Sequence, residues 1–244
     1  MESLKKLKSR IIDENFFRPR WYSIFINPYF INRWTLYRSM QTFAAHVPAD
    51  AKILDIGCGI KPYRSLFASP SYIGIDIEGG GHGDEEKTVD AYYDGENVPF
   101  PDNSFDVTLC TQVLEHASNP AALVSEASRV LSSGGTVFFS MPFVYPEHET
   151  PYDFRRFTRF EHTRLLEGAG FKDIRIMPTT GFFGVFSQLF VVMCFEGMHF
   201  RAPLLKALLT FFIFAPIQAL GLLLDFVFRK PALTMDYVVT ATKI

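Results

Sequence analysis

Short apolar runs, each bounded by turn-forming residues, alternate with amphipathic stretches through the middle of the chain. Runs of this kind are typical of buried β-strands, and the stretches between them are typical of helices. Strands that alternate with helices predict a parallel sheet with right-handed crossovers, which is the α/β class. The predicted strands lie at Ile53–Leu54, Tyr72–Ile77, Thr136–Ser140, Lys172–Pro178 and Asp236–Lys243.

Two helices can be placed by the residues that begin them. Asn119 followed by Pro120 is a favoured N-cap and first-turn pair, and it predicts a helix with Leu123 and Val124 on its buried face. Thr158, with Glu161 three residues later, has the pattern of a capping box and predicts a helix over Arg159–Glu167.

Residues 181–230 have a different pattern, because apolar residues run there almost without interruption. Phe182–Phe195 is almost wholly apolar, and Leu204–Phe228 follows with Pro216 near its middle. A helix of about 25 residues can cross ~30 Å of hydrocarbon, and the first segment is too short by that measure. Both flanking strands should join one sheet, so the chain must return to its starting side. A re-entrant or interfacial helical hairpin is therefore expected, with an apolar dimer interface or a large lid as the alternatives.

The segment 1–48, ahead of the first strand, combines basic and aromatic residues. Its first 40 residues hold eight Lys or Arg and three acidic residues, and both tryptophans of the chain, Trp21 and Trp34, lie there. One interpretation is a pair of helices that packs across the sheet edge and closes a ligand site. Another is an interfacial segment, because Trp and Tyr beside Lys and Arg suit the headgroup region of a bilayer. A nucleic-acid contact is a third.

Composition limits the possible functions further. The net charge is −2, so no global basic field of the kind expected of a general nucleic-acid binder is present, and no nucleic-acid partner is expected. Cys58, Cys110 and Cys194 lie far apart without paired metal spacing, which predicts a reduced cytosolic protein without disulfides and with no metal. The basic residues near the N-terminus are not followed by an apolar run, so no signal peptide is expected.

A glycine turn with a carboxylate at a fixed distance beyond it forms the first candidate site. Asp55 precedes Gly57-Cys58-Gly59 directly after an apolar run, and glycines there allow a positive φ and a close approach of a ligand to the backbone. Asp76 ends the next predicted strand, about 20 residues on, where a carboxylate suits ribose hydroxyls. The alternative for Asp76 is a solvated strand end.

The block from Asp94 to Asp106, followed by Val113-Leu114-Glu115-His116, makes the pattern specific. Together with the glycine turn, these blocks resemble the class I methyltransferases that use S-adenosylmethionine, in the group with a D-x-x-x-LPF-x-D-x-SFD … LEH pattern. The likeness runs from about Lys52 to Phe171 in the correct order. It departs at the frequent third glycine of the turn, where this chain has Ile60-Lys61.

The resemblance implies a Rossmann-like, seven-stranded, mostly parallel sheet with helices on both faces and an antiparallel last strand. It also implies S-adenosylmethionine as the cofactor, with Asp55 and the turn at its methionine end and Asp76 at its ribose. Asp94 with the backbone of Gly95 would flank the adenine, unless Asp94 is a simple loop residue. The implied cofactor-binding residues are Asp55, Gly57, Cys58, Gly59, Asp76, Ile77, Asp94, Gly95, Thr111 and Gln112.

The acceptor should bind at the loop after the fifth strand, Tyr145–Thr158, because open α/β folds place ligands at the carboxyl ends of their strands. His148 is the first candidate for a general base, because imidazole titrates near neutrality; Asp153 would orient it, and His116 is a weaker candidate. Tyr145, Tyr152, Arg155 and Arg156 are the candidate substrate-binding residues. The alternative is that Asp153 and the arginines form a structural ion pair.

The sequence thus predicts a methyltransferase domain over 49–180 and 231–244, an N-terminal segment over 1–48 and an apolar hairpin over 181–230. The expected reaction is methylation, at a hydroxyl oxygen, of a lipid-linked, glycan or isoprenoid-type acceptor. The expected location is the inner, cytoplasmic face of the cell membrane, held by the hairpin. A non-catalytic scaffold that keeps the fold is the main rival, and a nicotinamide-dependent oxidoreductase is disfavoured because the turn lacks a full G-x-G-x-x-G. The oligomeric state is left open.

Overall fold

The computed structural model describes residues 16–79, 87–198, 202–228 and 233–244. The chain divides into two compact units. The sheet unit comprises Gln41–Met177 and Tyr237–Ile244, and the hairpin unit comprises the described parts of Met1–Met40 and Pro178–Asp236. The N-terminal segment and the apolar insertion, which the sequence analysis treated separately, therefore share one unit. The basic residues near the N-terminus on which the signal-peptide expectation rested lie outside the described residues; they are Lys5, Lys6, Lys8 and Arg10.

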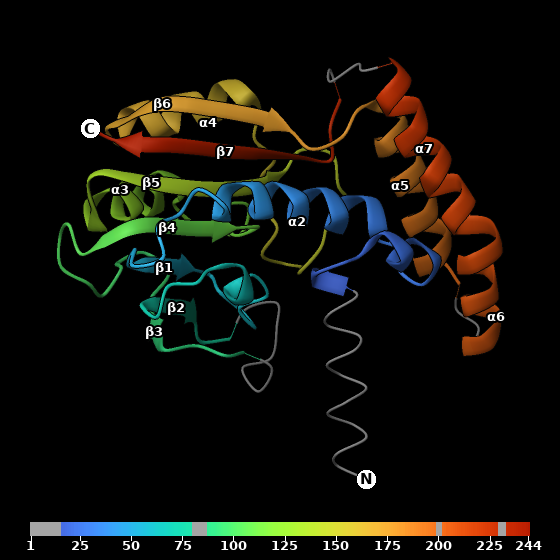
Figure 1. Ribbon diagram of the computed structural model, residues 1–244, viewed down its shortest axis with the longest axis horizontal. Coiled ribbons are helices and arrows are strands. Elements are labelled where there is room, and N and C mark those ends of the chain that lie inside the picture. The colour runs from blue at the N-terminus through green and yellow to red at the C-terminus, as the bar shows by residue number, and fades with distance from the viewer. Residues whose placement is uncertain (1–15, 80–86, 199–201, 229–232) are drawn as a thin grey trace, which may run out of the picture. The chain divides into compact units, whose positions relative to one another are not determined.

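Seven strands form one sheet in the order β3-β2-β1-β4-β5-β7-β6 (Figure 1). β1, β2, β3, β4 and β5 are parallel, with Ile53 of β1 opposite Tyr72 of β2 and Val107 of β4. β7 runs opposite to its neighbours in Figure 1, so the predicted mostly parallel sheet with an antiparallel last strand is confirmed. The strands are β1 (Ile53–Ile56), β2 (Tyr72–Ile77), β3 (Ala91–Tyr93), β4 (Phe105–Thr111), β5 (Leu131–Pro142), β6 (Phe171–Pro178) and β7 (Asp236–Lys243).

The helices of the sheet unit begin where their caps predict. In α3 (Pro120–Val130) the side chain of Asn119 accepts a hydrogen bond from the N–H of Ala122 at 3.2 Å. In α4 (Arg159–Gly168) the hydroxyl of Thr158 accepts one from the N–H of Glu161 at 3.4 Å. One turn of 3-10 helix, η2 (Arg64–Leu66), lies between β1 and β2. The buried faces of α3 and α4 join strand residues in one apolar core.

β5 starts earlier than the expected Thr136–Ser140, directly after α3 ends at Val130. Gly134 has a φ of +79°, and a Cβ at Gly135 would lie 2.8 Å from the carbonyl oxygen of Ser132. The register with β4 also shifts between Phe105 and Val107. The two glycines therefore let the strand pass through an irregularity that would normally end it.

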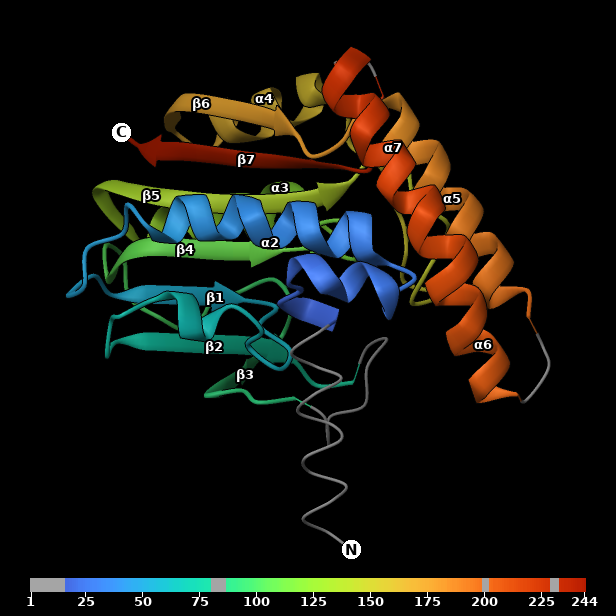
Figure 2. The same ribbon diagram turned by 45° about the vertical axis from the view of Figure 1, so that its right-hand side comes forward.

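The hairpin unit holds α5 (Phe182–Glu196) and a second helix that runs from Pro203 to Phe228, which lie side by side in Figures 1 and 2. The second helix is α6 (Pro203–Leu209), a π-helical turn labelled η4 (Thr210–Phe214) and α7 (Ala215–Phe228). The π turn lies directly ahead of Pro216, whose ring would clash with a carbonyl of the preceding turn in a regular α-helix. The wider turn lets the helix continue through the proline. η1 (Trp21–Phe25) and α2 (Phe30–Ala44) come from the N-terminal segment.

Two buried glutamines connect the hairpin to the N-terminal segment. The side chains of Gln188 in α5 and Gln218 in α7 are both fully buried. Each accepts a hydrogen bond from one backbone N–H and donates one to a backbone carbonyl of the N-terminal segment. The partners are Asn32 N–H (3.2 Å) and Pro28 carbonyl (2.7 Å) for Gln188, and Ile31 N–H (3.3 Å) and Asn27 carbonyl (3.2 Å) for Gln218. Buried amides that are paired in this way fix the packing of the segment, because unpairing them would carry a desolvation cost.

Asp225 of α7 also binds backbone groups of another segment, at the first turn of α5. Its carboxylate accepts hydrogen bonds from the N–H groups of Gly181 (2.7 Å), Phe183 (2.9 Å) and Gly184 (3.0 Å). The first amides of a helix have no partner within the helix, and a carboxylate there also matches the helix dipole. The acidic residue of an otherwise apolar helix thus caps its neighbour.

Candidate active site

The glycine turn after β1 has the tight backbone that the sequence predicts. Gly57 and Gly59 have φ values of +69° and +50°. A Cβ at Gly57 would overlap the side chain of Val113, whereas a Cβ at Gly59 would meet nothing within 4 Å. Gly57 is therefore required by packing as well as by conformation. The thiol of Cys58 is buried below the turn, and this burial raises its pKa, so it does not act as a nucleophile at neutral pH.

Asp76, at the end of β2, is tied to this turn. Its Oδ2 accepts a hydrogen bond from the N–H of Gly59 at 2.8 Å, and its Oδ1 lies 3.5 Å from the Nζ of Lys87. Ile77, beside it, is 37% exposed. The structure thus brings the carboxylate of β2 and the glycine turn of β1 together at the carboxyl end of the sheet, where the predicted ribose contact requires them.

Lys61 stands at the position where the family often has a third glycine. Its φ of +52° is in the left-handed region, so it adopts the conformation that a glycine would favour. Its Nζ pairs with Oδ2 of Asp90 at 2.5 Å, and the same oxygen accepts from the N–H of Gly74 at 2.7 Å. An ion pair that also holds β2 stabilises the turn here in the absence of the glycine.

Asp55, the last polar residue of β1, is 2% exposed. Its Oδ2 accepts a hydrogen bond from the hydroxyl of Tyr72 at 2.6 Å. Burial raises the pKa of Asp55 to about 7, against the opposing effect of the Tyr72 hydrogen bond. A positively charged ligand beside it would favour the carboxylate, so binding of such a ligand should release a proton near neutral pH.

Asp94 and Gly95 follow β3 in a tight turn, where Gly95 has a φ of +87°. The Asp94 carboxylate accepts hydrogen bonds from the N–H groups of Glu96 (2.8 Å) and Asn97 (2.6 Å) and from the side chain of Asn97 (2.7 Å). The hydrogen bonds from Asn97, with that from Glu96, lower the pKa of Asp94 to about 2. The carboxylate thus shapes its own loop, and its contact with adenine stays a prediction.

Thr111, which the resemblance implies as a cofactor-binding residue, is the last residue of β4, and Gln112 follows it. Gln112 has a φ of +56°, and its Nε2 lies 3.3 Å from the hydroxyl of Ser140 on β5. The backbone therefore turns sharply as it leaves β4, which directs the next residues, including Glu115 and His116, toward the end of the sheet.

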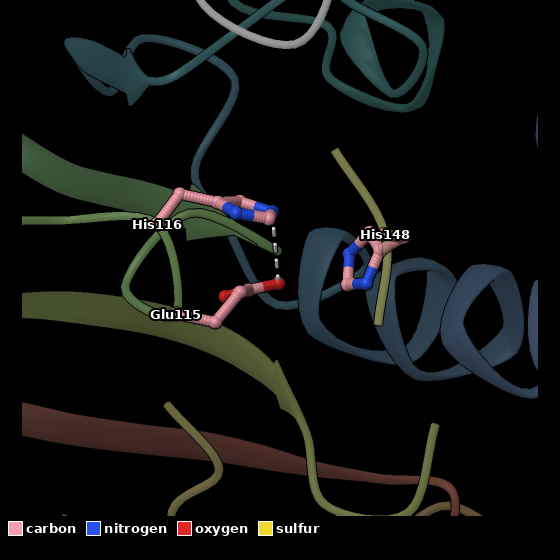
Figure 3. Close-up of side chains that lie close together, drawn as sticks. All are labelled: Glu115, His116 and His148. Atoms are coloured by element: carbon pink, nitrogen blue, oxygen red, sulfur yellow. Dashed lines mark ion pairs between the residues drawn. The ribbon is translucent and has the colours of Figure 1, made fainter. Parts of the chain in front are cut away.

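Glu115, His116 and His148 lie close together at this end of the sheet (Figure 3). The two imidazole rings are 4.9 Å apart between centroids, at an angle of 78°. Glu115 is fully buried, and the Nε2 of His116 lies 3.8 Å from its Oε1. The two candidate bases that the sequence analysis named, 32 positions apart in the chain, thus share one place in the fold.

Asp153 lies beside His148, as the sequence analysis proposed for an orienting residue. Its Oδ2 is 3.2 Å from the Nδ1 of His148 and accepts a hydrogen bond from the backbone N–H of His148 at 3.0 Å. Hydrogen bonds from Arg156 lower the pKa of Asp153 to about 2, so the carboxylate stays ionised. Desolvation lowers the pKa of His148, although Asp153 opposes this effect, so the imidazole is neutral at pH 7.

Both arginines of the loop bind protein groups. Arg156 forms two hydrogen bonds to Asp153, at 2.5 and 2.7 Å. Arg155 donates to the carbonyls of Ala117 (2.6 Å) and Ser118 (3.1 Å). The Arg156–Asp153 contact is the structural ion pair that stood as the alternative, whereas Arg155 binds the two backbone carbonyls instead. An acceptor anion on either arginine stays a prediction.

The two candidate tyrosines differ in their surroundings. The Tyr145 ring lies 5.4 Å from that of His148. Tyr152 is 47% exposed, and its carbonyl oxygen lies 3.1 Å from the Nδ1 of His116. Tyr145 is thus the better placed of the two to contact an acceptor at the histidines.

Glu115 is the site residue that the sequence analysis missed. It was noted only as part of the LEH pattern, although a carboxylate between a core leucine and a candidate histidine was the available indication. His162, in contrast, has no place in the site: it is 1% exposed and packs between the rings of Phe157 and Tyr237.

Comparison with known proteins agrees with this geometry. Residues 54–139 match a family model described as a methyltransferase domain. A probable S-adenosylmethionine-dependent methyltransferase from Mycolicibacterium smegmatis is 34% identical over 147 residues, 52% of this chain and 54% of that protein. A ubiquinone biosynthesis O-methyltransferase from Methylococcus capsulatus is 34% identical over 113 residues, 41% of this chain and 48% of that protein. The chain thus spans about half the length of these two relatives.

A solved structure extends the likeness to the whole fold. A SAM-dependent methyltransferase from Archaeoglobus fulgidus superposes with a TM-score of 0.56, covering 96% of this chain and 99% of that chain. The sequence identity is 15%, so this likeness concerns the fold alone.

Proposed function

The chain belongs to the class I methyltransferases that use S-adenosylmethionine, and we propose that it methylates a hydroxyl oxygen on a lipid-linked, glycan or isoprenoid-type acceptor at the cytoplasmic face of a membrane. Transfer from a sulfonium is an in-line displacement, so the protein has to align the acceptor with the methyl group and remove the hydroxyl proton. The cluster of Glu115, His116 and His148 is the place where that proton would be removed. Similarity to a ubiquinone biosynthesis O-methyltransferase supports the choice of oxygen.

The observation that carries the membrane proposal is the large apolar surface of the hairpin. Three of its polar side chains, Gln188, Gln218 and Asp225, bind backbone groups within the hairpin unit. Its outer side is apolar, with large exposed residues on both helices. Their exposed fractions include 44% for Phe182, 55% for Phe186, 54% for Phe190, 61% for Met193, 72% for Leu204, 65% for Phe212 and 69% for Phe226. A surface of this kind is unfavourable in water and favourable in hydrocarbon.

Phe182, Phe186, Phe190 and Met193 follow one another at helical spacing, so they form a continuous apolar stripe on α5. Among the described residues, Pro203–Phe228 is the helix long and apolar enough to cross a membrane by length and composition. α5 is shorter, about 22 Å at 1.5 Å per residue. This mismatch favours insertion of the hairpin into one leaflet over two complete spans.

The N-terminal segment supports the same proposal. Trp21 and Ile26 are 71% and 59% exposed, and the ring of Phe25 lies 5.0 Å from that of Phe211 in the hairpin. An exposed tryptophan between Arg20 and Tyr22, fixed to an apolar hairpin, suits the headgroup layer of a bilayer. The basic residues there would favour the anionic lipids of a cytoplasmic leaflet.

The membrane part is tested by flotation of purified protein with vesicles of phosphatidylcholine and phosphatidylglycerol. The double variant Phe186→Asp/Phe190→Asp should lose binding by more than about tenfold, since burying each phenylalanine contributes roughly 2 kcal/mol. The matched control is Phe154→Asp/Phe160→Asp, which replaces two exposed phenylalanines of the sheet unit and should float like the wild type. A wild-type protein that stays with the aqueous fraction without detergent would contradict the proposal and favour a lid or a dimer interface.

The transfer part is tested with radiolabelled S-adenosylmethionine and membrane lipid extracts. Asp76→Ala should abolish measurable cofactor binding, whereas His148→Ala should leave binding unchanged and lower turnover. Label in a chloroform-soluble, base-stable product would support an ether on a lipid-type acceptor. Binding of cofactor without transfer to any lipid, glycan or quinol fraction would count against the acceptor class, and absence of cofactor binding would favour the scaffold.

A further inference from the structure

Three potential metal ligands converge at the carboxyl ends of β4 and β5, in the part of the sheet unit that the structure describes (Figure 3). Glu115 and His116 follow β4, and His148 lies in the loop after β5. One ligand atom from each of the three lies within 4.8 Å of the others. The spacing of these residues in the sequence does not indicate a metal site, and none was predicted; the fold alone brings them together.

The hydrogen bonds of both histidines leave Nε2 as the unprotonated nitrogen. The Nδ1 of His116 lies 3.1 Å from the carbonyl oxygen of Tyr152, which can only accept, so Nδ1 carries the proton. The Nδ1 of His148 faces two acceptors, the Asp153 carboxylate at 3.2 Å and the Pro146 carbonyl at 3.3 Å. In a neutral imidazole with its proton on Nδ1, Nε2 presents a lone pair.

The surroundings of the His116 Nε2 lack a donor that could satisfy this lone pair. Among the described residues it has no hydrogen-bond partner, although the atom is buried. Two carboxylates lie near it, with Oε1 of Glu115 at 3.8 Å and Oε2 of Glu149 at 3.9 Å. A buried lone pair that faces carboxylate oxygens is stabilised by a proton or a metal cation between them, and a metal cation can serve both kinds of ligand at once. A tetrahedral zinc ion about 2.0–2.2 Å from each ligand places its ligand atoms about 3.3–3.6 Å apart, so the 3.8 Å separation of His116 and Glu115 needs only a small movement.

The arrangement behind His148 is of the kind that supports metal ligands. A histidine that binds a metal usually donates its other N–H to a carboxylate or a backbone carbonyl, which fixes the ring and its tautomer. Asp153 takes this place for His148, and Arg156 holds the Asp153 carboxylate with two hydrogen bonds. The side chain of Asp153 is 2% exposed, so its orientation is set by packing as well as by charge.

We propose that Glu115, His116 and His148 bind one divalent transition-metal ion, with zinc as the representative ion. Two imidazoles and one carboxylate favour zinc or iron(II) over magnesium or calcium, which prefer oxygen ligands alone. Three protein ligands leave at least one position open, as in catalytic zinc sites. Closing the longest separation in the cluster to that of a metal site needs side-chain movements of roughly 1 Å.

The role of this metal site rests on the proposed O-methylation, for which it would supply the group that activates the acceptor hydroxyl. An acceptor hydroxyl bound at the open position would have its pKa lowered, and its proton would leave to solvent. The oxygen would then attack the methyl carbon: the O–C bond forms, the C–S bond breaks, and its electron pair goes to sulfur, giving S-adenosylhomocysteine. His148 would act as a ligand in this scheme, and the metal would replace it as the group that activates the hydroxyl.

The test is zinc binding to untagged, full-length protein in detergent, measured by competition with a chromophoric chelator. The wild type should bind one equivalent, and Glu115→Gln, His116→Gln and His148→Gln should each weaken binding at least about tenfold. His46→Gln is the matched control, because His46 is an exposed histidine away from the cluster, and it should bind like the wild type. S-adenosylmethionine binding by each variant would show that the fold is retained.

Cobalt provides a second readout, since its visible absorption reports ligand type and geometry without any acceptor. A cobalt spectrum lost in His116→Gln but retained in His46→Gln would support the site. Equal zinc affinity in the cluster variants and in the control would overturn it. Methyl transfer that continues in excess chelator would overturn the metal's role while leaving the proposed function intact, and one bound metal without any methyl transfer would leave the site intact and count against the function.

Discussion

The two units of this chain differ in how many large apolar side chains they expose. The sheet unit buries its aliphatic and aromatic residues between sheet and helices, with Ile53, Leu54, Phe138 and Phe139 at most 1% exposed. The hairpin unit buries Gln188 and Gln218 beside apolar residues such as Val185 and Val191, and it exposes large apolar residues on α5 and on the helix Pro203–Phe228. The first arrangement is that of a protein dissolved in water, and the second is expected where hydrocarbon is the solvent.

On the proposed function, this difference would separate cofactor chemistry from membrane attachment in one sequence. The match to a methyltransferase family covers residues 54–139, all of them in the sheet unit. The hairpin lies outside that family match, so its role is argued from its pattern of exposure. Family similarity thus supports the methyltransferase chemistry, whereas the membrane attachment is our proposal and rests on physical reasoning alone. Substitutions that disable one unit and spare the other test whether this separation is real.

The largest effect is expected at Gly57 in the sheet unit. Gly57→Ala places a Cβ against Val113 and forces alanine to a φ of +69°, which together should cost about 3 kcal/mol of stability in this unit. S-adenosylmethionine binding, measured by calorimetry, should fall more than about tenfold because the turn must shift. Vesicle flotation should not change.

Gly59→Ala is the matched control, since its Cβ would meet nothing within 4 Å and only its φ of +50° is unfavourable. It should cost about 1 kcal/mol. Equal losses in the two variants would show that steric overlap at Val113 is not what makes Gly57 necessary.

An intermediate effect is expected at Asp225 in the hairpin unit. Asp225→Ala removes the acceptor for the N–H groups of Gly181, Phe183 and Gly184, and should destabilise the first turn of α5 by about 2 kcal/mol. Limited proteolysis in detergent should then cut near residues 181–184 sooner than in the wild type. Cofactor affinity should stay within about twofold, and a parallel loss of cofactor binding would contradict the separation of the units.

The smallest effect is a pH dependence from His162 in the core of the sheet unit. Desolvation lowers its pKa to about 4, so the unfolded state takes up a proton at a higher pH than the folded state does. The free energy of unfolding is therefore unaffected by protonation of His162 above about pH 6.5 and decreases as the pH falls from there toward 4. Between pH 7.5 and 5.5 the loss is about 1.4 kcal/mol.

The measurement is the difference in unfolding free energy between wild type and His162→Phe across this pH range. Asp55 acts in the opposite direction, because its raised pKa of about 7 makes the folded state the stronger proton binder and lowers stability as the pH rises. Since Asp55 is present in both proteins, its effect cancels in the difference. A difference that is flat from pH 7.5 to 5.5 would show that His162 is not desolvated as described.

Elements whose position depends only on their own residues could be predicted from the sequence. The last strand, Asp236–Lys243, and the start of α3 at Pro120 lie where alternation and capping place them. The seven-stranded sheet was expected, but no residues were predicted for β3, Ala91–Tyr93, because three residues give too little periodicity. β5 was predicted too short, because Gly134 and Gly135 resemble a stop and only the register with β4 shows that they lie within a strand.

The sequence predicted which residues belong to the cofactor part of the candidate site, but it did not predict that Glu115, His116 and His148 lie together. Asp55, Gly57 and Asp76 follow a spacing that the family pattern contains, so their meeting at the end of β1 and β2 was expected. The convergence of Glu115, His116 and His148 depends on β4 and β5 being neighbours, which no local spacing encodes. The same holds for Gln188 and Gln218, whose partners lie at the other end of the chain.

The central claim, that one chain joins a cofactor-binding sheet to a membrane-binding hairpin, is tested most directly by co-flotation. Full-length protein is mixed with tritiated S-adenosylmethionine and vesicles of phosphatidylcholine and phosphatidylglycerol, and the label is counted in the floating fraction. With the wild type, protein and label should both float. With Asp76→Ala the protein should float and the label should remain below. With Phe186→Asp/Phe190→Asp both protein and label should remain below. Wild-type protein that carries label but stays below the vesicles, or that floats without label, would contradict the account.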